Sequence, residues 1–363
     1  MALNISGKLF GGVLCNGNTF VRFQSVLATK LMYAEYGDPC KVVQKCEEPL
    51  PDIKGSDVLI RMLAAPVNPA DINTIQGKYP SRPELPAVPG NEGVGEVVQV
   101  GSDVTDFCPG DRIVPLANLL GTWRSHAVLN SRQLLKIPKE LGIVEASTLT
   151  VNPCTAYRML KDFADLKEGD VVIQNGANSA CGQNVIQLAN IWGLKTVNIV
   201  RDRPKIGELR NFLKQLGATE VLTEEELRKT DLFKSKKLPK PKLGLNCVGG
   251  KNALEVMRHL NHGSSIVTYG GMSREPVTVP TSALIFKDIK VRGFWMTEWT
   301  KRNVDSPQRK EMFEELIKYM CEKKLHGPAY KMVEFQNFRE ALMNTMTIKG
   351  MIGLKYILDF EKC

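Results

Sequence analysis

The feature that most constrains the fold is the stretch from residue 169 to residue 203. Residues 170–174 form a short apolar run of the kind found in buried strands. A turn of small residues follows at 175–182, and residues 183–192 carry apolar side chains at helical spacing. A second apolar run covers 195–200. This order of strand, glycine-containing turn, helix and strand predicts a nucleotide-binding unit.

The turn departs from the G-x-G-x-x-G fingerprint of dinucleotide-binding proteins, because Asn178, Ser179 and Ala180 stand where glycines are expected. Small residues still allow the backbone to approach a pyrophosphate. The N-terminus of the following helix also directs free N–H groups toward the turn, which favours an anion there.

The end of the second strand reads Arg201-Asp202-Arg203. A lone acidic residue at this point accepts hydrogen bonds from the free ribose hydroxyl of NAD, whereas guanidinium groups pair with the extra phosphate of NADP. The sequence therefore predicts NADPH. The alternative is a solvated strand end, which the intervening Asp202 leaves open.

Strands and helices continue to alternate up to Met272, which predicts a doubly wound parallel sheet. Ligands of such sheets lie beyond the carboxyl ends of the strands. We therefore expect residues 175–181, 201–203 and 269–272 to converge on one crevice. Before this unit, short apolar runs between Gly and Pro turns, at 58–67, 90–101 and 109–114, predict a small β-barrel.

The composition indicates a globular protein of two domains, with 363 residues, 43% of them hydrophobic, and no apolar segment long enough to span a membrane. The net charge of +9 is spread along the chain, which permits an acidic partner. No nucleic-acid-binding signature is present, so that class of partner is disfavoured. The lysine-rich run 236–242 indicates a solvated loop or, alternatively, a docking patch.

The first acidic residue is Glu35, and the preceding segment offers Lys8, Arg22 and several hydroxyl residues. This pattern predicts a mitochondrial transit peptide over residues 1–29 and a location in the matrix. The nine cysteines contain no C-x-x-C pair, and small buried hydrophobes are expected at Cys154, Cys181 and Cys247.

Several motifs together resemble the medium-chain dehydrogenase/reductase superfamily from about Lys30 onward. They are Asn68-Pro-Ala-Asp71, Pro89-Gly-Asn-Glu-Gly93, Pro109-Gly-Asp-Arg112 and the nucleotide unit. Its zinc alcohol dehydrogenases have a His where this chain has Asn91, and a four-Cys lobe that is missing here, so no metal is expected. The resemblance implies a GroES-like β-barrel catalytic domain over 30–151, a Rossmann NADPH-binding domain over 152–291, and a return to the catalytic domain over 292–363.

Within the superfamily, the chain closely resembles the mitochondrial enoyl-thioester reductases. The matching segments are Gln76–Pro80, Thr122–Arg124, Val151–Arg158, Leu245–Gly250, Val267–Met272 and Arg292–Trp295. The resemblance implies NADPH-dependent reduction of 2-enoyl thioesters, with Tyr79 as the proton-donating tyrosine. It also implies that the cofactor contacts are Asn152, Asn178, Ser179, Ala180, Cys181, Arg201, Asp202, Arg203, Tyr269, Gly270, Gly271, Met272, Phe294, Trp295, Met296, Thr297 and Lys355.

The same resemblance implies a homodimer and a substrate on an acidic acyl carrier protein or on CoA. Basic residues that could steer such a carrier are Arg124, Lys301, Arg302, Arg309 and Lys310. Two alternatives stay open. The sister quinone reductases share several of the motifs, and a protein that keeps NADPH but has become an RNA- or receptor-binding module is compatible with the charge.

Overall fold

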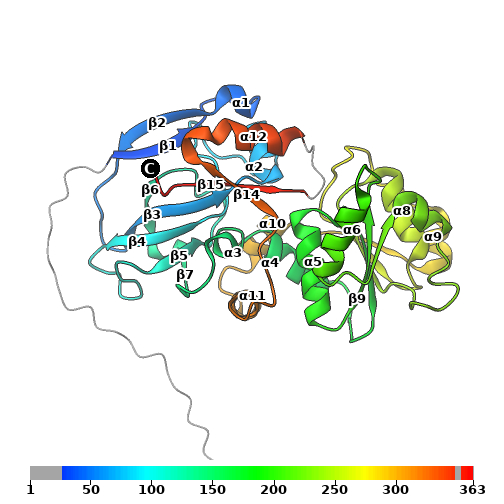
Figure 1. Ribbon diagram of the computed structural model, residues 1–363. Helices are drawn as coiled ribbons and strands as arrows, with labels where there is room; N and C mark the ends of the chain where they lie inside the picture. The colour runs from blue at the N-terminus through cyan, green and yellow to red at the C-terminus, as the bar shows by residue number, and fades with distance from the viewer. Residues whose placement is uncertain (1–26, 348–352, 363) are drawn as a thin grey trace, which may run out of the picture.

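The chain folds into two lobes that lie side by side (Figure 1). This computed structural model describes residues 27–347 and 353–362. The first lobe combines the N-terminal part of the chain with its last strands, and the second is built around a parallel sheet. No helix in the described ranges is long and apolar enough to cross a membrane.

The first lobe is the predicted β-rich domain. Its seven-stranded sheet has the order β14-β15-β3-β4-β5-β7, with β6 paired to β3, and a separate β1-β2 hairpin lies beside it. Its strands are β1 (Leu27–Met32), β2 (Gln44–Pro49), β3 (Asp57–Pro66), β4 (Val94–Val100), β5 (Arg112–Pro115), β6 (His126–Asn130), β7 (Leu134–Ile137), β14 (Tyr330–Glu334) and β15 (Lys355–Asp359). Its helices are α1 (Pro39–Val42), α2 (Pro69–Ile75), α3 (Ile143–Ser147) and α12 (Phe338–Thr347).

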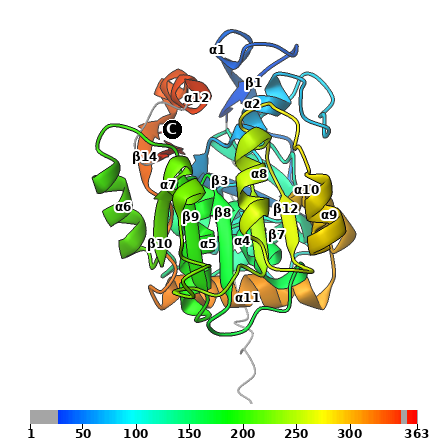
Figure 2. The ribbon, with the colours of Figure 1, turned by 90° about the vertical axis from the view of Figure 1, so that its right-hand side faces the viewer.

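The second lobe is the predicted doubly wound sheet. Its six strands have the order β10-β9-β8-β11-β12-β13, and every pairing is parallel. The strands are β8 (Val171–Asn175), β9 (Lys195–Val200), β10 (Glu220–Thr223), β11 (Leu243–Asn246), β12 (Ser265–Thr268) and β13 (Lys290–Gly293). The helices are α5 (Ala180–Ile191), α6 (Ile206–Gln215), α7 (Glu224–Lys229), α8 (Gly250–His259) and α9 (Thr281–Lys287). Figure 2 looks onto this lobe.

Alternation along β8 explains why helices cover both faces of this sheet. Val171 and Ile173 pack with Val256 of α8, whereas Val172, between them, packs with Val185 of α5. Such a strand is buried on both faces and reads as a continuous apolar run, which is the pattern that the sequence shows.

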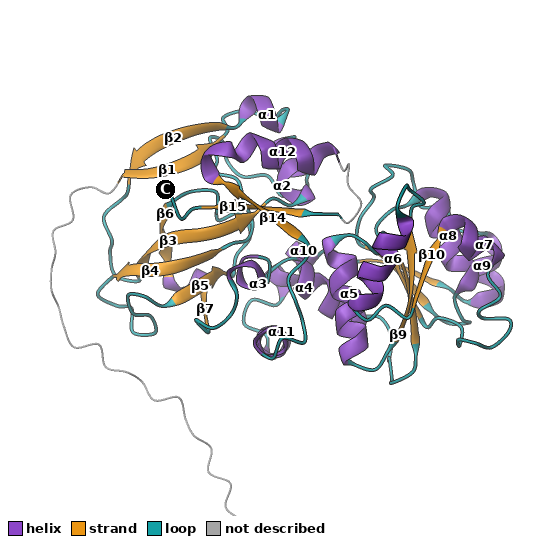
Figure 3. Ribbon diagram, in the orientation of Figure 1, coloured by secondary structure: helices purple, strands orange, loops and turns teal. Residues whose placement is uncertain are grey.

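The two lobes share one core. Ala64 and Val94 of the first lobe belong to the same buried cluster as Val185 and Leu188 of α5. Helices α4 (Asn152–Asp162), α10 (Met296–Arg302) and α11 (Pro307–Cys321) lie between the sheets, as Figure 3 shows. The shared core holds the two lobes together.

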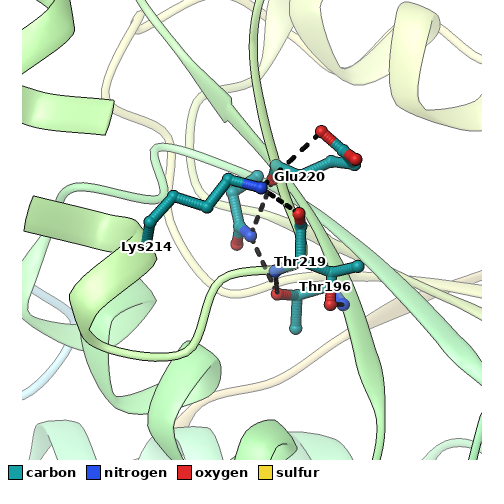
Figure 4. A network of polar contacts seen from close by, with 5 residues as sticks. Thr196, Lys214, Thr219 and Glu220 are labelled. Atoms are coloured by element: carbon teal, nitrogen blue, oxygen red, sulfur yellow. Dashed lines mark hydrogen bonds and ion pairs between the residues drawn. The ribbon is translucent and has the colours of Figure 1, made fainter. Parts of the chain in front are cut away.

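The start of β10 is held against β9 by polar contacts (Figure 4). The Thr196 and Thr219 hydroxyls each accept from the other residue's backbone N–H, at 3.3 and 3.0 Å. Lys214 of α6 donates to the carbonyl of Thr219 and lies 3.8 Å from the Glu220 carboxylate. These contacts fix the amino end of β9, whose other end leads into residues 201–203.

Some predicted boundaries differ from the structure. Helix α5 begins at Ala180 and not at residue 183, because Ser179 is its N-cap and accepts from the Gly182 N–H at 3.1 Å. The last strand of the sheet, β13, crosses the predicted domain boundary at 291/292, since it runs from Lys290 to Gly293. Strand β1 begins at Leu27, within the last part of the predicted transit peptide, and residues 1–26 lie outside the described residues.

Candidate active site

The turn between β8 and α5 depends on two glycines that pack tightly against neighbouring residues. Gly176 has a φ of +58°, and a Cβ there would lie 2.4 Å from the Cys247 sulfur. A Cβ at Gly182 would lie 2.6 Å from the carbonyl oxygen of Ala177, so this glycine allows α5 to pack on the strand. The free N–H groups of α5 therefore face the turn, where an anion is favoured.

A buried row of amide side chains aligns this turn with the neighbouring strand ends. The Asn175 Nδ2 donates to Asn246 Oδ1 at 2.7 Å, and Asn246 Nδ2 donates to Thr268 Oγ1 at 3.0 Å. The Cys247 N–H donates in turn to Asn175 Oδ1 at 2.8 Å. The carboxyl ends of β8, β11 and β12 are thus fixed side by side, as the sequence predicted for its converging segments.

Residues 201–203 leave the carboxyl end of β9, next to the turn. Arg201 and Asp202 are exposed, and Arg203 is half-buried. Burial and the neighbouring Arg201 lower the pKa of Arg203. The Arg203 Nε donates to the Arg201 carbonyl oxygen at 3.1 Å, and the Arg203 N–H donates to Asp202 Oδ1 at 2.8 Å. Two cations therefore lie at the strand end where the distal ribose of a dinucleotide binds.

The segment after β12 is held against the end of β11. The Tyr269 N–H donates to the Asn246 carbonyl at 3.0 Å, and the Met272 N–H donates to that of Cys247 at 2.9 Å. Gly271 has open space around its Cα, and Met272 is exposed. The Tyr269 ring turns inward instead: burial, together with the neighbouring Cys247 and Cys181 thiols, raises the pKa of its phenol well above the usual range.

Tyr79 and Trp295 meet although 216 residues separate them in the sequence. The indole Nε1 donates to the Tyr79 hydroxyl oxygen at 2.7 Å, and the rings pack edge to face with centroids 5.7 Å apart. Tyr79 follows α2, and its N–H donates to the carbonyl of Asn73 at 3.2 Å. Because the hydroxyl oxygen already accepts from Trp295, the hydroxyl proton can be donated to a substrate.

Phe294, Met296 and Thr297 flank Trp295 where the chain leaves β13. The Phe294 ring packs edge to face on Phe163, with centroids 5.8 Å apart, and Met296 packs against the shared core. These two side chains support Trp295 from the interior. Lys301 lies close to the same ring, with its Nζ 5.9 Å from the centre of the Trp295 ring.

A buried polar cluster joins the start of α2, the start of β15 and the residue before α4, and the sequence did not predict it as a unit. Glu92 is fully buried, and its two carboxylate oxygens accept from Asn68 Nδ2 at 2.8 Å and from the Val151 N–H at 3.0 Å. Lys355 is 6% exposed and donates to Asn68 Oδ1. Asp71 accepts from the Asn68 N–H at 2.8 Å and from Asn91 Nδ2 at 2.6 Å.

Burial dominates the ionisation of this cluster. It raises the pKa of Glu92 to about 7 and that of Asp71 to about 6, although Lys355 opposes both shifts. Burial lowers the pKa of Lys355, against the attraction of the two carboxylates and of the Cys181 thiol.

Asn152, the first residue of α4, bears on whether the residues present suit the predicted cofactor. Its Nδ2 is buried and has no hydrogen-bond partner among the described residues. A buried donor without an acceptor is costly unless a ligand supplies one. The amide carbonyls and phosphates of a nicotinamide dinucleotide are acceptors of this kind, so the residues present fit such a group.

The described residues, 27–347 and 353–362, contain no group of three or more His, Cys, Asp or Glu side chains that could hold a metal ion. Cys154, Cys181 and Cys247 are buried free thiols, and burial raises the pKa of each. They pack as the sequence predicted for small buried hydrophobes.

Comparison with known proteins assigns the fold and the family. Residues 54–139 match the alcohol dehydrogenase GroES-like domain, and residues 180–318 match the family described as zinc-binding dehydrogenase. The mitochondrial enoyl-[acyl-carrier-protein] reductase of Rattus norvegicus is 51% identical over 335 residues, which cover 90% of this chain and 87% of that protein. The Homo sapiens protein of the same name is 50% identical over 333 residues, with the same coverage of 90% and 87%. The chain belongs to the mitochondrial enoyl-[acyl-carrier-protein] reductase family.

The solved structures agree with this family. The complex of Etr1p with NADP and crotonyl-CoA superimposes with a TM-score of 0.86 at 33% identity, over 92% of this reductase and 100% of that chain. A mitochondrial Etr1p/Etr2p heterodimer from Candida tropicalis gives 0.86 at 32%, with the same coverage of 92% and 100%. A quinone reductase-type structure from Bacillus thuringiensis is 24% identical, which shows the shared fold alone. The predicted family, fold, oxidoreductase class and mitochondrial location are confirmed.

Two of the five basic residues considered for steering a carrier are unsuited to it. Arg309 is buried and donates to the carbonyl oxygens of Leu116 and Val304. Arg124 is half-buried and donates to the Leu120 carbonyl at 2.6 Å. Both guanidinium groups therefore donate to backbone carbonyls. Lys301, Arg302 and Lys310 are exposed.

Proposed function

We propose that this reductase uses NADPH to reduce the 2,3 double bond of trans-2-enoyl thioesters, with Tyr79 as the group that assists the reaction. The contact between Tyr79 and Trp295 at the crevice carries the proposal. The Etr1p structure with NADP and crotonyl-CoA supports it, because that protein is 33% identical to this chain and holds a nicotinamide cofactor and an enoyl thioester.

For the cofactor, the supporting residues come from both lobes. The α5 N-terminus with Asn178, Ser179, Ala180 and Cys181 suits the pyrophosphate. Arg201 and Arg203 suit the 2'-phosphate, since planar guanidinium groups pair with phosphate in two-point contacts. The remaining predicted contacts lie at the start of α4, after β12, after β13 and at the start of β15; they are Asn152, Tyr269 to Met272, Phe294 to Thr297 and Lys355.

The protein's part in the chemistry is electrostatic. When bound, NADPH supplies the hydride that the β-carbon of the enoyl group accepts. Electron density then moves onto the thioester oxygen, and the Tyr79 hydroxyl donates a hydrogen bond to this developing oxyanion. The α-carbon takes up a proton, from Tyr79 directly or through water, to complete the saturated thioester. Trp295 holds the Tyr79 oxygen in place throughout.

The acyl group arrives on acyl carrier protein or on CoA. Lys301, beside Trp295, offers a positive charge at the rim of the site, whereas Arg302 is paired with Glu298 at 2.8 Å. A single cation at this position assists the approach of an acidic carrier.

The proposal is tested by following NADPH absorbance with a trans-2-enoyl thioester and, separately, with a quinone. We expect oxidation of NADPH that depends on the thioester, with NADH as a poor substitute. Oxidation with the quinone alone would contradict the proposal and favour the sister reductases. If neither substrate is turned over while NADPH still binds, the binding-module alternative would gain support.

We infer that the protein is a homodimer joined along β13. Within the described sheet β13 pairs only with β12, and all its residues are exposed. The preceding helix adds exposed apolar side chains, including Ile285 at 67% and Phe286 at 75%. An open strand edge beside such a patch favours pairing with a second copy. The Candida heterodimer shows that a protein 32% identical to this chain assembles in pairs.

Light scattering of the wild-type protein should therefore give twice the mass of one chain. Replacing Ile285 and Phe286 together by Asp should give single chains, because charges at the interface would be buried without partners. Val304→Asp is the matched control, since Val304 is 57% exposed and lies between α10 and α11. A wild-type mass equal to one chain would refute the dimer.

A further inference from the structure

Among the described residues, Glu92 is the buried carboxylate that touches both the chain segment leading to Tyr79 and the segment leading to the cofactor. Through Oε1 it accepts from Asn68, the residue directly before α2, and α2 leads into the Tyr79 turn. Through Oε2 it accepts from the Val151 N–H, one residue before Asn152. Both partners are N–H donors, so the arrangement requires two acceptor oxygens on residue 92.

The Asn68 amide cannot rotate to accommodate a different neighbour. Its Oδ1 accepts from the Lys355 ammonium while its Nδ2 donates to Glu92. A flip of this amide would bring its NH2 group against the ammonium and its oxygen against the carboxylate. Which group donates and which accepts is therefore fixed for each hydrogen bond that joins Lys355, Asn68, Glu92 and Val151.

We propose that Glu92 is a positioning residue that fixes the segment from α2 to Tyr79 and the start of α4, at Val151 and Asn152, relative to each other. The proposal rests on the proposed function, and it assigns the residue that joins its two halves. Glu92 itself does not touch the reacting atoms. It acts through Asn68 on one side and through Val151 on the other.

The variant Glu92→Gln removes one acceptor and keeps the shape. Its amide presents NH2 either to Asn68 Nδ2 or to the Val151 N–H, and both are donors. We expect kcat/KM for the enoyl thioester to fall about 10- to 100-fold, the effect of one unmade hydrogen bond to a charged group. The matched control is Glu96→Gln, because Glu96 lies four residues on, is partly exposed and contacts Arg61 at 3.5 Å. This control should keep wild-type kinetics.

Exchanging the carboxylate and the amide between positions 92 and 68 provides the decisive test. In the double variant Glu92→Gln with Asn68→Asp, the new amide oxygen accepts from Val151, and the new NH2 group donates to the carboxylate introduced at position 68. The second oxygen of that carboxylate still accepts from Lys355, so all hydrogen bonds and the net charge are kept. Asn68→Asp alone opposes two carboxylates and should be impaired, whereas the double variant should recover at least tenfold over the worse single variant. A residue that only fills space would show no such recovery.

The pH profile gives an independent readout. Asp71 on α2, Lys355 on β15 and the Cys154 thiol on α4 face Glu92. Because the pKa of Glu92 is about 7, its carboxylate protonates as the pH falls below that value and loses an acceptor. Wild-type turnover should decline below about pH 7, and Glu92→Gln should lack that limb.

Kinetics that are equal for Glu92→Gln and Glu96→Gln, or a double variant no better than the worse single one, would overturn the proposal. NADPH binding is titrated in parallel by fluorescence, so that the variants are compared even without turnover. An inactive wild-type protein would contradict the proposed function. Equal NADPH affinities of the wild type, Glu92→Gln and Asn68→Asp in that case would contradict the positioning role as well.

Discussion

Replacing Tyr79 by Phe should lower turnover on a short trans-2-enoyl thioester by about two to three powers of ten, with NADPH affinity changed less than about threefold. Loss of one donor to a developing oxyanion typically has this size. The phenyl ring preserves the edge-to-face contact with Trp295, so the change removes only the hydroxyl and the hydrogen bond that it accepts from the indole. Steady-state kinetics and a fluorescence titration with NADPH measure the two quantities separately.

Tyr36→Phe is the matched control for this variant. The Tyr36 side chain lies against Gly77, near the Tyr79 turn, and its hydroxyl donates to the Pro83 carbonyl at 3.2 Å. The variant Tyr36→Phe thus removes a tyrosine hydroxyl from the same part of the lobe as Tyr79. Turnover by Tyr36→Phe should stay within about twofold of wild type. If Tyr79→Phe behaves in the same way, Tyr79 is not the assisting group.

The sequence predicted the nucleotide unit well because its signals are local. A strand buried on both faces reads as a continuous apolar run, and the turn and helix follow within a few residues. The start of α5 was misjudged because the apolar period begins after the first turn of the helix, whereas the Ser179 N-cap determines the actual start.

The contacts that assemble the site are of another kind. Tyr79 meets Trp295 across 216 residues, and Asn68 meets Lys355 across 287. Neither pair has a periodic signature, because side chains so far apart in the sequence meet only once the sheets are formed. The family resemblance named Tyr79, Trp295 and Lys355 individually, but their partners follow from the fold. Glu92 was visible only as part of a Gly-rich motif, since nothing local shows that a carboxylate is buried.

Replacing Arg201 and Arg203 together by Ala should reduce the preference for NADPH over NADH by about two to three powers of ten. Each guanidinium that pairs with the 2'-phosphate contributes on the order of 1.5–3 kcal/mol, which corresponds to roughly one to two powers of ten. Use of NADH should change little, because Asp202 remains and can accept hydrogen bonds from a free ribose hydroxyl. The measurement is kcat/KM for each cofactor at a fixed enoyl thioester concentration.

The two single variants separate the roles of these arginines. In Arg201→Ala the backbone carbonyl that accepts from Arg203 Nε is retained, so Arg203 keeps its anchor and the loss should be smaller than in the double variant. Lys195→Ala is the control, because it removes an exposed cation from the opposite end of β9. Equal losses with NADPH and NADH would mean that these residues stabilise the strand end and do not recognise phosphate. A loss confined to NADPH would instead place its 2'-phosphate at the carboxyl end of β9, where the sheet geometry and the two cations coincide.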